Sequence, residues 1–254
     1  MKNNFQYPNT NSARAKITDL DEKYKGLKIA IIGLGGTGSY VLDLIAKTPV
    51  AEIHIFDKDV FQLHNAFRAP GATSGDFFND NPNIKKVDYH YKIYSQMHAG
   101  IIVHAEHVTE DNVYLLKDFD FIFICVDKNK ARSFIIKALL EFAVSFVDSG
   151  IDVQRRGDVL DAAIRVTMST DEKNDHLVNR IGSDERENNE YHSNIQIAEL
   201  NSFAAGQAVI RWKRHIGYYL DLKFEYNTLW FSSTNKMINE DHHEPSTNEK
   251  NSAA

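Results

Sequence analysis

The sequence predicts an α/β fold: a Rossmann-like, doubly wound and mostly parallel sheet, with antiparallel strands added in the C-terminal part. Strand-like apolar runs alternate with helical patterns from Lys28 to about Asp148, as expected of successive βαβ units. From Val159 to Met168 apolar and polar residues alternate one by one, which is typical of antiparallel strands. The 254 residues, of which 43% are hydrophobic, are enough to bury a sizeable core.

The strongest local signal is a glycine run after the first predicted strand. Lys28–Ile32 is a nearly unbroken apolar segment, as in a strand buried on both faces. The glycines that follow it are Gly33, Gly35, Gly36 and Gly38. Apolar residues at helical spacing come next, so the loop opens a helix. Such a loop brings backbone N–H groups and the positive end of a helix dipole to phosphates, and it predicts a nucleotide site.

Two predicted strands end in an acidic residue. The segment from Glu52 to Asp57 is the second strand, and an acid at its end commonly accepts hydrogen bonds from ribose hydroxyls. The buried strand from Asp118 to Asp127 also ends in an acid. Because parallel strands end at the same edge of a sheet, Asp57 and Asp127 are expected to lie together beside the nucleotide.

The remaining elements follow from the same patterns of spacing. Ser12 is a candidate N-cap of a short early helix that runs to Tyr24 and ends at Gly26. Helical spacing also predicts helices over Ile84–Met97, Ser133–Phe142 and about Ile195–His215. Further strands are predicted over Ile101–His107, Ser145–Asp148 and Phe224–Ser232.

These elements divide the chain into an arm, one main domain and a tail. Thr170–Asn189 is charged and poor in apolar residues, which predicts an exposed crossover loop, and the sequence after Asn239 predicts disorder. The expected boundaries are an N-terminal helical arm over 1–27, a main domain over 28–239 with its nucleotide-binding half over 28–148 and its crossover loop over about 170–193, and a disordered tail over 240–254.

Composition excludes several classes of protein. The formal net charge is −6, which argues against a general affinity for nucleic acid. No apolar run is long enough for a membrane span, and the first residues lack a signal-peptide core, so a cytoplasmic location is expected. Cys125 is the only cysteine, which rules out an intrachain disulfide and a Cys-x-x-Cys zinc clip. The 11 histidines are scattered, so no zinc is expected.

Several short motifs resemble one family. They are Gly-Leu-Gly-Gly-Thr-Gly at 33–38, Phe-Asp-Lys-Asp at 56–59, His-Asn-Ala-Phe-Arg at 64–68, Lys-Lys-Val at 85–87 and Cys-Val-Asp-Lys at 125–128, followed by Arg132. Together they resemble the ThiF/MoeB-type adenylyltransferases, the superfamily that includes ubiquitin-activating enzymes. The segment over 194–201 is similar to a subgroup found in bacterial operons with ubiquitin-like genes.

The resemblance implies an ATP-dependent reaction on a small protein. The C-terminal carboxylate of a ubiquitin-like or sulfur-carrier-like protein would attack the α-phosphate of ATP, giving an acyl adenylate and pyrophosphate. By similarity, Asp57 would hold the ribose, and Asn65 and Arg68 would contact the phosphates. Catalysis of this kind depends on positioning and charge neutralisation rather than on covalent help from the enzyme.

Three further residues take roles from the same resemblance. Lys86 would neutralise charge near the α- and β-phosphates; it is preferred to Lys85 because the lysine of the family directly precedes a valine, here Val87. Asp127 would help to hold Mg²⁺, a metal that bridges phosphate oxygens with only one or two protein carboxylates. Asp59 matches a family acid and would bind or order the nucleotide loop.

Arg14 is a candidate that depends on a second subunit. Family dimers place an arginine from near the N-terminus in the ATP site of the partner, and Arg14 lies upstream of the glycine loop at a comparable, shorter distance. The resemblance therefore implies a homodimer, with an ordinary exposed helix arginine as the competing interpretation.

The chain departs from the family at its cysteines. Many relatives carry two zinc-binding Cys-x-x-Cys pairs and a crossover-loop cysteine that forms a thioester; Thr170–Ser193 contains no cysteine. Cys125 lies within an apolar strand, which favours a buried structural thiol. We therefore expect the adenylate of a partner ending in glycine to pass directly to an acceptor or conjugating protein.

Other functions remain open at this level. An NAD-dependent oxidoreductase uses the same glycine fingerprint, but hydride transfer has no need of the cations Arg68 and Lys86 around a scissile phosphate. Relatives of the same family act on peptides or on a modified tRNA nucleoside, and the acidic net charge makes the tRNA partner less attractive. A scaffold that dimerises with an active relative is the non-enzymatic alternative.

Overall fold

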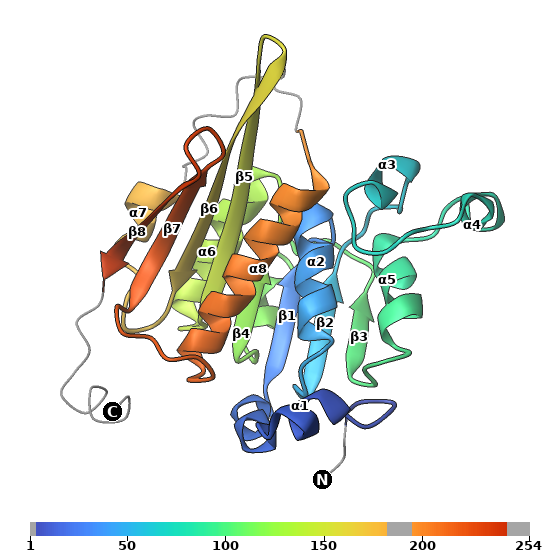
Figure 1. Ribbon diagram of the computed structural model, residues 1–254, viewed down its shortest axis with the longest axis horizontal. Helices are drawn as coiled ribbons and strands as arrows, with labels where there is room; N and C mark the ends of the chain where they lie inside the picture. Colours follow the sequence, from blue (N-terminus) through green and yellow to red (C-terminus); the bar gives the residue numbers. More distant parts are fainter. Residues whose placement is uncertain (1–3, 182–194, 243–254) are drawn as a thin grey trace.

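One eight-stranded sheet organises the molecule (Figure 1). The computed structural model describes residues 4–181 and 195–242. The strands are β1 (Lys28–Ile32), β2 (Glu52–Phe56), β3 (Ile101–His104), β4 (Phe121–Ile124), β5 (Phe146–Arg156), β6 (Val159–Ser169), β7 (Glu225–Phe231) and β8 (Lys236–His242). Their order is β3-β2-β1-β4-β5-β6-β7-β8. The first five in this order pair in parallel and the remainder antiparallel, which confirms the predicted fold class.

Helices cover both faces of the parallel part. The longer helices are α2 (Gly36–Ile45), α5 (Lys86–Tyr94), α6 (Asn129–Glu141) and α8 (Ala198–His215). The short ones are α1 (Thr10–Ala15), α3 (Leu63–Ala66), α4 (Gly75–Asp80) and α7 (Leu177–Arg180), with 3-10 helices at Thr18–Tyr24 and Val113–Leu116. Figure 1 shows α2 and α8 side by side in front of the sheet and α6 behind it.

The alternation of side chains along β1 explains the two layers. Ile29 and Ile31 point to the face covered by α2, α5 and α8 and belong to the larger core cluster. Ala30 and Ile32 point to the opposite face, where they pack with residues of α6. All four side chains are buried. A strand buried on both faces reads as a continuous apolar run, which is the pattern seen in the sequence.

The topology places the glycine loop at a switch point of the sheet. β1 pairs with β2 on one side and with β4 on the other. The strands that follow β1 are therefore added first on one side of it (β2, β3) and then on the other (β4, β5). Ligands of doubly wound folds bind at the carboxyl ends of strands beside such a point. In this molecule that is the end where β1 runs through the glycine loop into α2.

The N-terminal arm differs from the prediction of one helix. Asn9, rather than Ser12, is the N-cap of α1, because its side chain accepts hydrogen bonds from two N–H groups of the first turn. Lys16 then adopts a left-handed conformation with φ 57° and ends α1. The 3-10 helix that ends at Tyr24 is a separate element.

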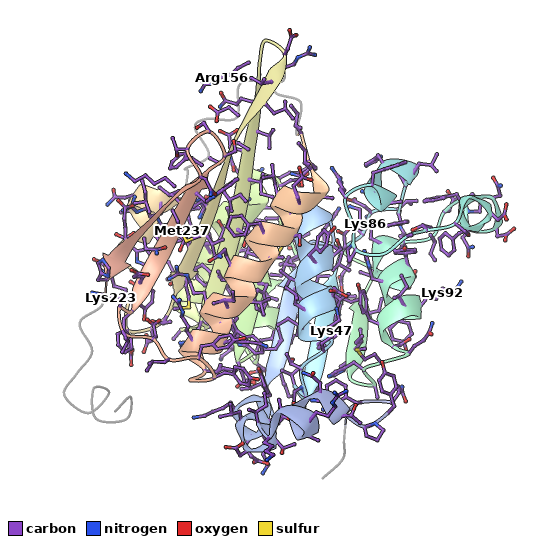
Figure 2. All side chains as sticks on the ribbon, in the orientation of Figure 1. Lys47, Lys86, Lys92, Arg156, Lys223 and Met237 are labelled. Carbon is purple, nitrogen blue, oxygen red and sulfur yellow. The ribbon has the colours of Figure 1, made fainter. Side chains whose placement is uncertain are left out.

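The C-terminal part also extends beyond its prediction. β5 and β6 form an antiparallel hairpin with paired residues from Phe146–Ser169 to Arg156–Val159, so β5 is far longer than a strand ending at Asp148. Figure 2 shows Arg156 near the outer end of this hairpin. The predicted tail is wrong at its start, because β8 continues through residues 240–242.

The predicted crossover loop over 170–193 is only partly visible. Its first part contains the short helix α7, which the sequence did not predict, and its remainder, like residues 243–254, lies outside the part of the chain that the structure describes. Within the described ranges, none of the helices combines the length and apolarity needed to cross a bilayer.

Candidate active site

A cavity of about 660 Å³ opens at the carboxyl ends of the parallel strands. It is bordered by the glycine loop, the ends of β2 and β4, the first residues of α5 and the inner part of the β5–β6 hairpin. Eight of the residues predicted for the site line it: Gly33, Gly35, Gly36, Asp57, Asp59, Arg68, Lys86 and Asp127. The fold thus brings together residues that are up to 94 positions apart in the sequence, from Gly33 to Asp127.

The glycine loop is shaped by close backbone contacts. Gly33 has a φ of +90°, and a Cβ on it would lie 2.8 Å from the carbonyl oxygen of Cys125. A Cβ on Gly38 would lie 1.9 Å from the carbonyl oxygen of Gly33. Gly38 is absent from the cavity lining. Its lack of a side chain allows α2 to pack against the loop and the end of β4. The N-cap of α2, Gly35, makes no side-chain cap bond, which leaves N–H groups at the helix start available to an anion.

Asp57 connects the glycine loop to the end of β2. Its carboxylate accepts a hydrogen bond of 2.8 Å from the N–H of Leu34 and another of 2.8 Å from the N–H of Asp59. The residue is buried, at 5% exposure. Asp57 therefore holds the loop in place at the same time as it faces the cavity, and its oxygens keep lone pairs for further donors.

Lys86 begins α5 and points back toward these acids. Its Nζ lies 2.7 Å from Oδ2 of Asp59 and 3.5 Å from Oδ2 of Asp57. Figure 2 labels Lys86 between the ends of the strands and α3. Lys85 instead donates to the carbonyl oxygen of Lys58 and is absent from the cavity lining. Burial raises the pKa of Asp59, but the hydrogen bond and charge of Lys86 lower it more, so the net pKa is lowered.

Arg68 and Asp127 face the cavity from different loops. Burial lowers the pKa of Arg68, and the nearby charge of Asp127 opposes this change. The Nε of Arg68 is buried and has no hydrogen-bond partner among the described residues. A buried guanidinium N–H without an acceptor is costly, so this atom indicates an anionic ligand. The cavity therefore combines backbone donors, several cations, among them Arg68 and Lys86, and several carboxylates.

Asn65 and Arg14, like Gly38, are predicted site residues that lie outside the cavity lining. Asn65 is buried and its Oδ1 accepts a hydrogen bond of 2.8 Å from the N–H of Gln62. Together with Gln62 it forms a capping box that fixes α3. Asn65 thus orients the turn that carries Arg68, since the N–H of Arg68 donates to its carbonyl oxygen. A phosphate contact by Asn65 stays a prediction.

Arg14 lies far from the cavity of its own chain. It is an exposed residue of α1, and Figure 1 places α1 at the end of the sheet opposite to the glycine loop. A role for Arg14 within its own protomer would require a rearrangement of the arm. The predicted role in a partner's site stays a prediction.

Cys125 borders the cavity at the end of β4. Burial raises the pKa of its thiol, the charge of Asp148 raises it further, and Arg132 opposes both. The protonated thiol is a poor nucleophile at neutral pH. Its contacts with the glycine loop are structural, because its backbone carbonyl and its Cβ approach Gly33 and Gly38.

A buried ionic network includes two of the arginines that line the cavity. Asp148 is fully buried and binds two arginines that line the cavity: Nε of Arg132 at 2.8 Å, and Arg165 from β6. Arg132 also donates to the carbonyl oxygen of Val126, next to Asp127. Asp148 and Arg165 are not among the residues that the sequence motifs predict for the site. The available signal was a charged residue at the end of an apolar strand and another within an alternating one.

The fold and the glycine-lined cavity define the class of this protein: Rossmann-like α/β proteins with a phosphate-binding loop at the switch point of a parallel sheet. Within this class the match is to the ThiF family over residues 10–209, and the chain belongs to the ThiF family. Members of this family are adenylyltransferases, which confirms the resemblance found in the motifs.

Curated relatives are ubiquitin-like modifier-activating enzymes. The chain is 25% identical over 150 residues to ubiquitin-like modifier-activating enzyme 5 of Dictyostelium discoideum, covering 51% of this chain and 36% of that protein. It is 23% identical over 155 residues to the same enzyme of Oryza sativa subsp. japonica, covering 54% and 35%. The matches therefore span little more than a third of each relative.

Solved structures share the fold over nearly the whole chain. A structure of E. coli MccB with ATP superimposes with a TM-score of 0.70 at 16% identity, covering 95% of this chain and 74% of that chain. PaaA superimposes with a TM-score of 0.67 at 17% identity, covering 94% and 76%. At these identities the likeness establishes the fold.

The oxygen donors of the cavity fit magnesium better than zinc. Among residues 4–181 and 195–242, no group of three or more His, Cys, Asp or Glu side chains is arranged to hold a metal ion. A magnesium ion that bridges phosphates needs only one or two protein carboxylates. Asp127, an exposed carboxylate at the cavity, meets that requirement.

Proposed function

We propose that this protein is an ATP-dependent adenylyltransferase that activates the C-terminal carboxylate of a ubiquitin-like or sulfur-carrier-like protein ending in glycine. The observation that carries this proposal is the cavity, where the glycine loop, Arg68, Lys86 and Asp127 converge. Membership of the ThiF family and the ubiquitin-like modifier-activating enzymes among the relatives support the substrate class.

The proposed reaction is a displacement at phosphorus. A carboxylate oxygen of the protein substrate forms a bond to the α-phosphorus of ATP, and the bond to the oxygen that bridges to the β-phosphate breaks. The products are an acyl adenylate and pyrophosphate, which takes the electron pair of the broken bond. Lys86 and Arg68 stabilise the negative charge that shifts onto the leaving group.

The cavity offers separate positions for the parts of ATP. N–H groups at the start of α2 bind phosphate oxygens, and Asp57 and Asp59 at the end of β2 accept from the ribose. A magnesium ion held by Asp127 would neutralise phosphate charge when bound. Lys86 is already held by two carboxylates at 2.7 and 3.5 Å, so its position does not depend on the nucleotide.

The fate of the adenylate differs from that in enzymes with a crossover-loop thiol. Residues 170–193 contain no cysteine, and Cys125 has a raised pKa and structural contacts. We infer that the adenylate passes directly to an acceptor or conjugating protein. Cys125→Ser is expected to retain both exchange and discharge; loss of discharge with normal exchange would contradict this inference.

A homodimer is part of the proposal. Arg14 lies away from its own cavity, and in a dimer that brings α1 to the partner's cavity it would add a further cation beside Arg68 and Lys86. Support for this comes from the family resemblance.

Activation of a different carboxyl or amide substrate is the second candidate. Structures of MccB together with MccA share this fold over 95% of the chain, and they favour a peptide-length segment as an alternative substrate. An NAD-dependent oxidoreductase is less well supported, because its chemistry leaves the cations of the cavity without a task.

Pyrophosphate exchange tests the proposal and includes a matched control. Purified protein, ATP, Mg²⁺ and candidate ubiquitin-like partners should give exchange that depends on the partner. Lys86→Met is expected to lower exchange by about 10²–10³-fold, as for loss of one preorganised charge donor. Lys85→Met removes the same charge one residue away, outside the cavity, and should stay near the wild-type rate.

Two results would reject the proposal. One is the absence of exchange with every partner, combined with binding of NAD. The other is equal loss of exchange in Lys85→Met and Lys86→Met, which would mean that general surface charge, rather than the cavity, controls activity.

Omission of Mg²⁺, or Asp127→Asn, should reduce exchange, because each weakens neutralisation of the phosphates.

A further inference from the structure

Asn201 connects α8 to the start of the glycine-loop helix. The residue lies in α8, is fully buried, and its Oδ1 accepts a hydrogen bond of 2.9 Å from the hydroxyl of Thr37. Thr37 is the second residue of α2 and lines the cavity. The contact joins residues 164 positions apart. It directly connects α8, near the C-terminal end of the ThiF family match, to the predicted phosphate-binding loop.

Asn201 also explains why residue 36 is a glycine. A Cβ built on Gly36 would lie 2.2 Å from Nδ2, 2.3 Å from Cγ and 2.5 Å from Oδ1 of Asn201, and these are its three nearest atoms. Gly36 has no left-handed backbone conformation to require a glycine. The requirement is therefore steric, and it comes from one side chain.

The contact also orients the hydroxyl group of Thr37. Because the O–H donates to Asn201, only the lone pairs of Oγ1 remain for a ligand in the cavity. The Nδ2 of Asn201 is buried without a hydrogen-bond partner in the described part of the chain. A buried amide N–H without an acceptor costs stability. An apolar residue would avoid this cost, which indicates that the position serves the loop rather than the core.

We propose that Asn201 is a positioning residue for the nucleotide: it fixes the hydroxyl of Thr37 and the backbone of Gly36 at the start of α2. The inference rests on the proposed function in one respect, namely that the nucleotide is ATP. Asn201 acts through Thr37 and Gly36, so its loss weakens nucleotide binding and leaves the chemical step comparatively intact.

Calorimetric titration with ATP and Mg²⁺, without protein substrate, tests this first. Asn201→Ala and Thr37→Ala should each raise the Kd by about fivefold, the effect of one net hydrogen bond, and the double variant should lose no more than either single one. Thr37→Ser keeps the hydroxyl and should bind as wild type. In exchange assays the KM for ATP should rise in the same proportion, with kcat changed less.

The steric contact gives a second and independent test. Gly36→Ala alone should bind ATP poorly, because its methyl group meets the amide of Asn201. Gly36→Ala combined with Asn201→Gly removes that amide and should bring the Kd back to within about fivefold of wild type, the loss expected for Asn201→Ala alone. Thr37→Ala leaves Asn201 and Gly36 in place, so it decides the question if the Asn201 variants do not fold: an unchanged Kd for ATP in Thr37→Ala would overturn the inference.

The outcomes separate this inference from the proposed function. Wild-type protein that binds no ATP rejects both. Wild-type protein that binds ATP but shows no partner-dependent exchange rejects the proposed function alone. Unchanged ATP affinity in Asn201→Ala, multiplicative losses in the double variant with Thr37→Ala, or no recovery in the Gly36→Ala pair overturns the inference.

Discussion

His90 is a buried side chain whose polar atoms lower the stability of the fold. His90 is fully buried in α5, one turn after Lys86, and both of its ring nitrogens lack a hydrogen-bond partner among the described residues. It packs among Phe61, Tyr89 and Tyr94. Burial, assisted by the charge of Lys86, lowers its pKa from 6.5 to about 3. His90 is therefore a neutral residue of an aromatic cluster.

This shift predicts an acid-sensitive stability. As the pH falls below 6.5, the unfolded chain binds a proton at His90 that the native protein does not bind until about pH 3. Stability should therefore fall with decreasing pH across this window, by up to about 1.4 kcal/mol per unit from this residue. His90→Phe should flatten the dependence in urea unfolding from pH 7 to 4. The exposed His242→Phe is the control; an equally flattened curve there would contradict the assignment.

The site residues that could be predicted from the sequence are those that belong to a contiguous motif. Gly33, Asp57 and Lys86 follow recognisable patterns, and the structure brings them to one cavity. Asn201 has no such pattern, because its partner lies 164 residues away. A contact of that kind is a property of helix packing, and no local spacing encodes it.

At the scale of elements, β5 joins the two parts of the sheet. It pairs in parallel with β4 and antiparallel with β6. Asp148 lies at the last residue paired with β4 and binds Arg132 of α6 and Arg165 of β6. One buried carboxylate thus holds a helix and a strand to the point where the pairing changes.

Removal of this carboxylate should be strongly destabilising. Asp148→Asn leaves two arginines without their counter-charge, and we expect a loss of about 3–5 kcal/mol in the free energy of unfolding. Chemical denaturation measures this loss. Asp152→Asn, on the same strand but exposed, should change stability by less than about 0.5 kcal/mol. Equal effects of the two substitutions would show that the network contributes little.

Helices and strands were predictable where the apolar periodicity and the length of the segment indicated the same type of element. The parallel strands and the helices α2, α5, α6 and α8 have apolar patterns of the expected kind. β8 was missed because its residues are largely polar, as an edge strand tolerates. The turn that precedes it carried a signal: Asn235 has a φ of 51°, a conformation that asparagine adopts more readily than most residues. The arm was misjudged because Lys16, which ends α1, is not a usual helix terminator.

At the scale of the whole molecule, the position of α1 makes the dimer testable. The site residues and the arm lie at opposite ends of one sheet (Figure 1), so Arg14 can complete a site only in another protomer. The sequence predicted the parallel sheet and its added antiparallel strands. It could not predict the assembly, because a single chain contains no record of which surfaces meet.

Mixing two inactive variants distinguishes action in trans from action in cis. If Arg14 acts in the partner's site, a heterodimer of Arg14→Ala and Lys86→Ala contains one site with both native residues. After random exchange of equal amounts, about one quarter of all sites should be intact. Pyrophosphate exchange should recover accordingly on mixing. No recovery, although subunit exchange is shown by differently tagged protomers, would remove Arg14 from the site.

The hydrogen bond between Thr37 and Asn201 also affects when the protein becomes functional during its synthesis. The glycine loop leaves the ribosome early, but the side chain that fixes it belongs to a helix that ends at His215. A nascent chain that stops before α8 has the whole phosphate-binding motif and lacks the group that orders it. A ribosome-bound intermediate should therefore bind ATP more tightly once α8 has emerged and packed against α2 than before.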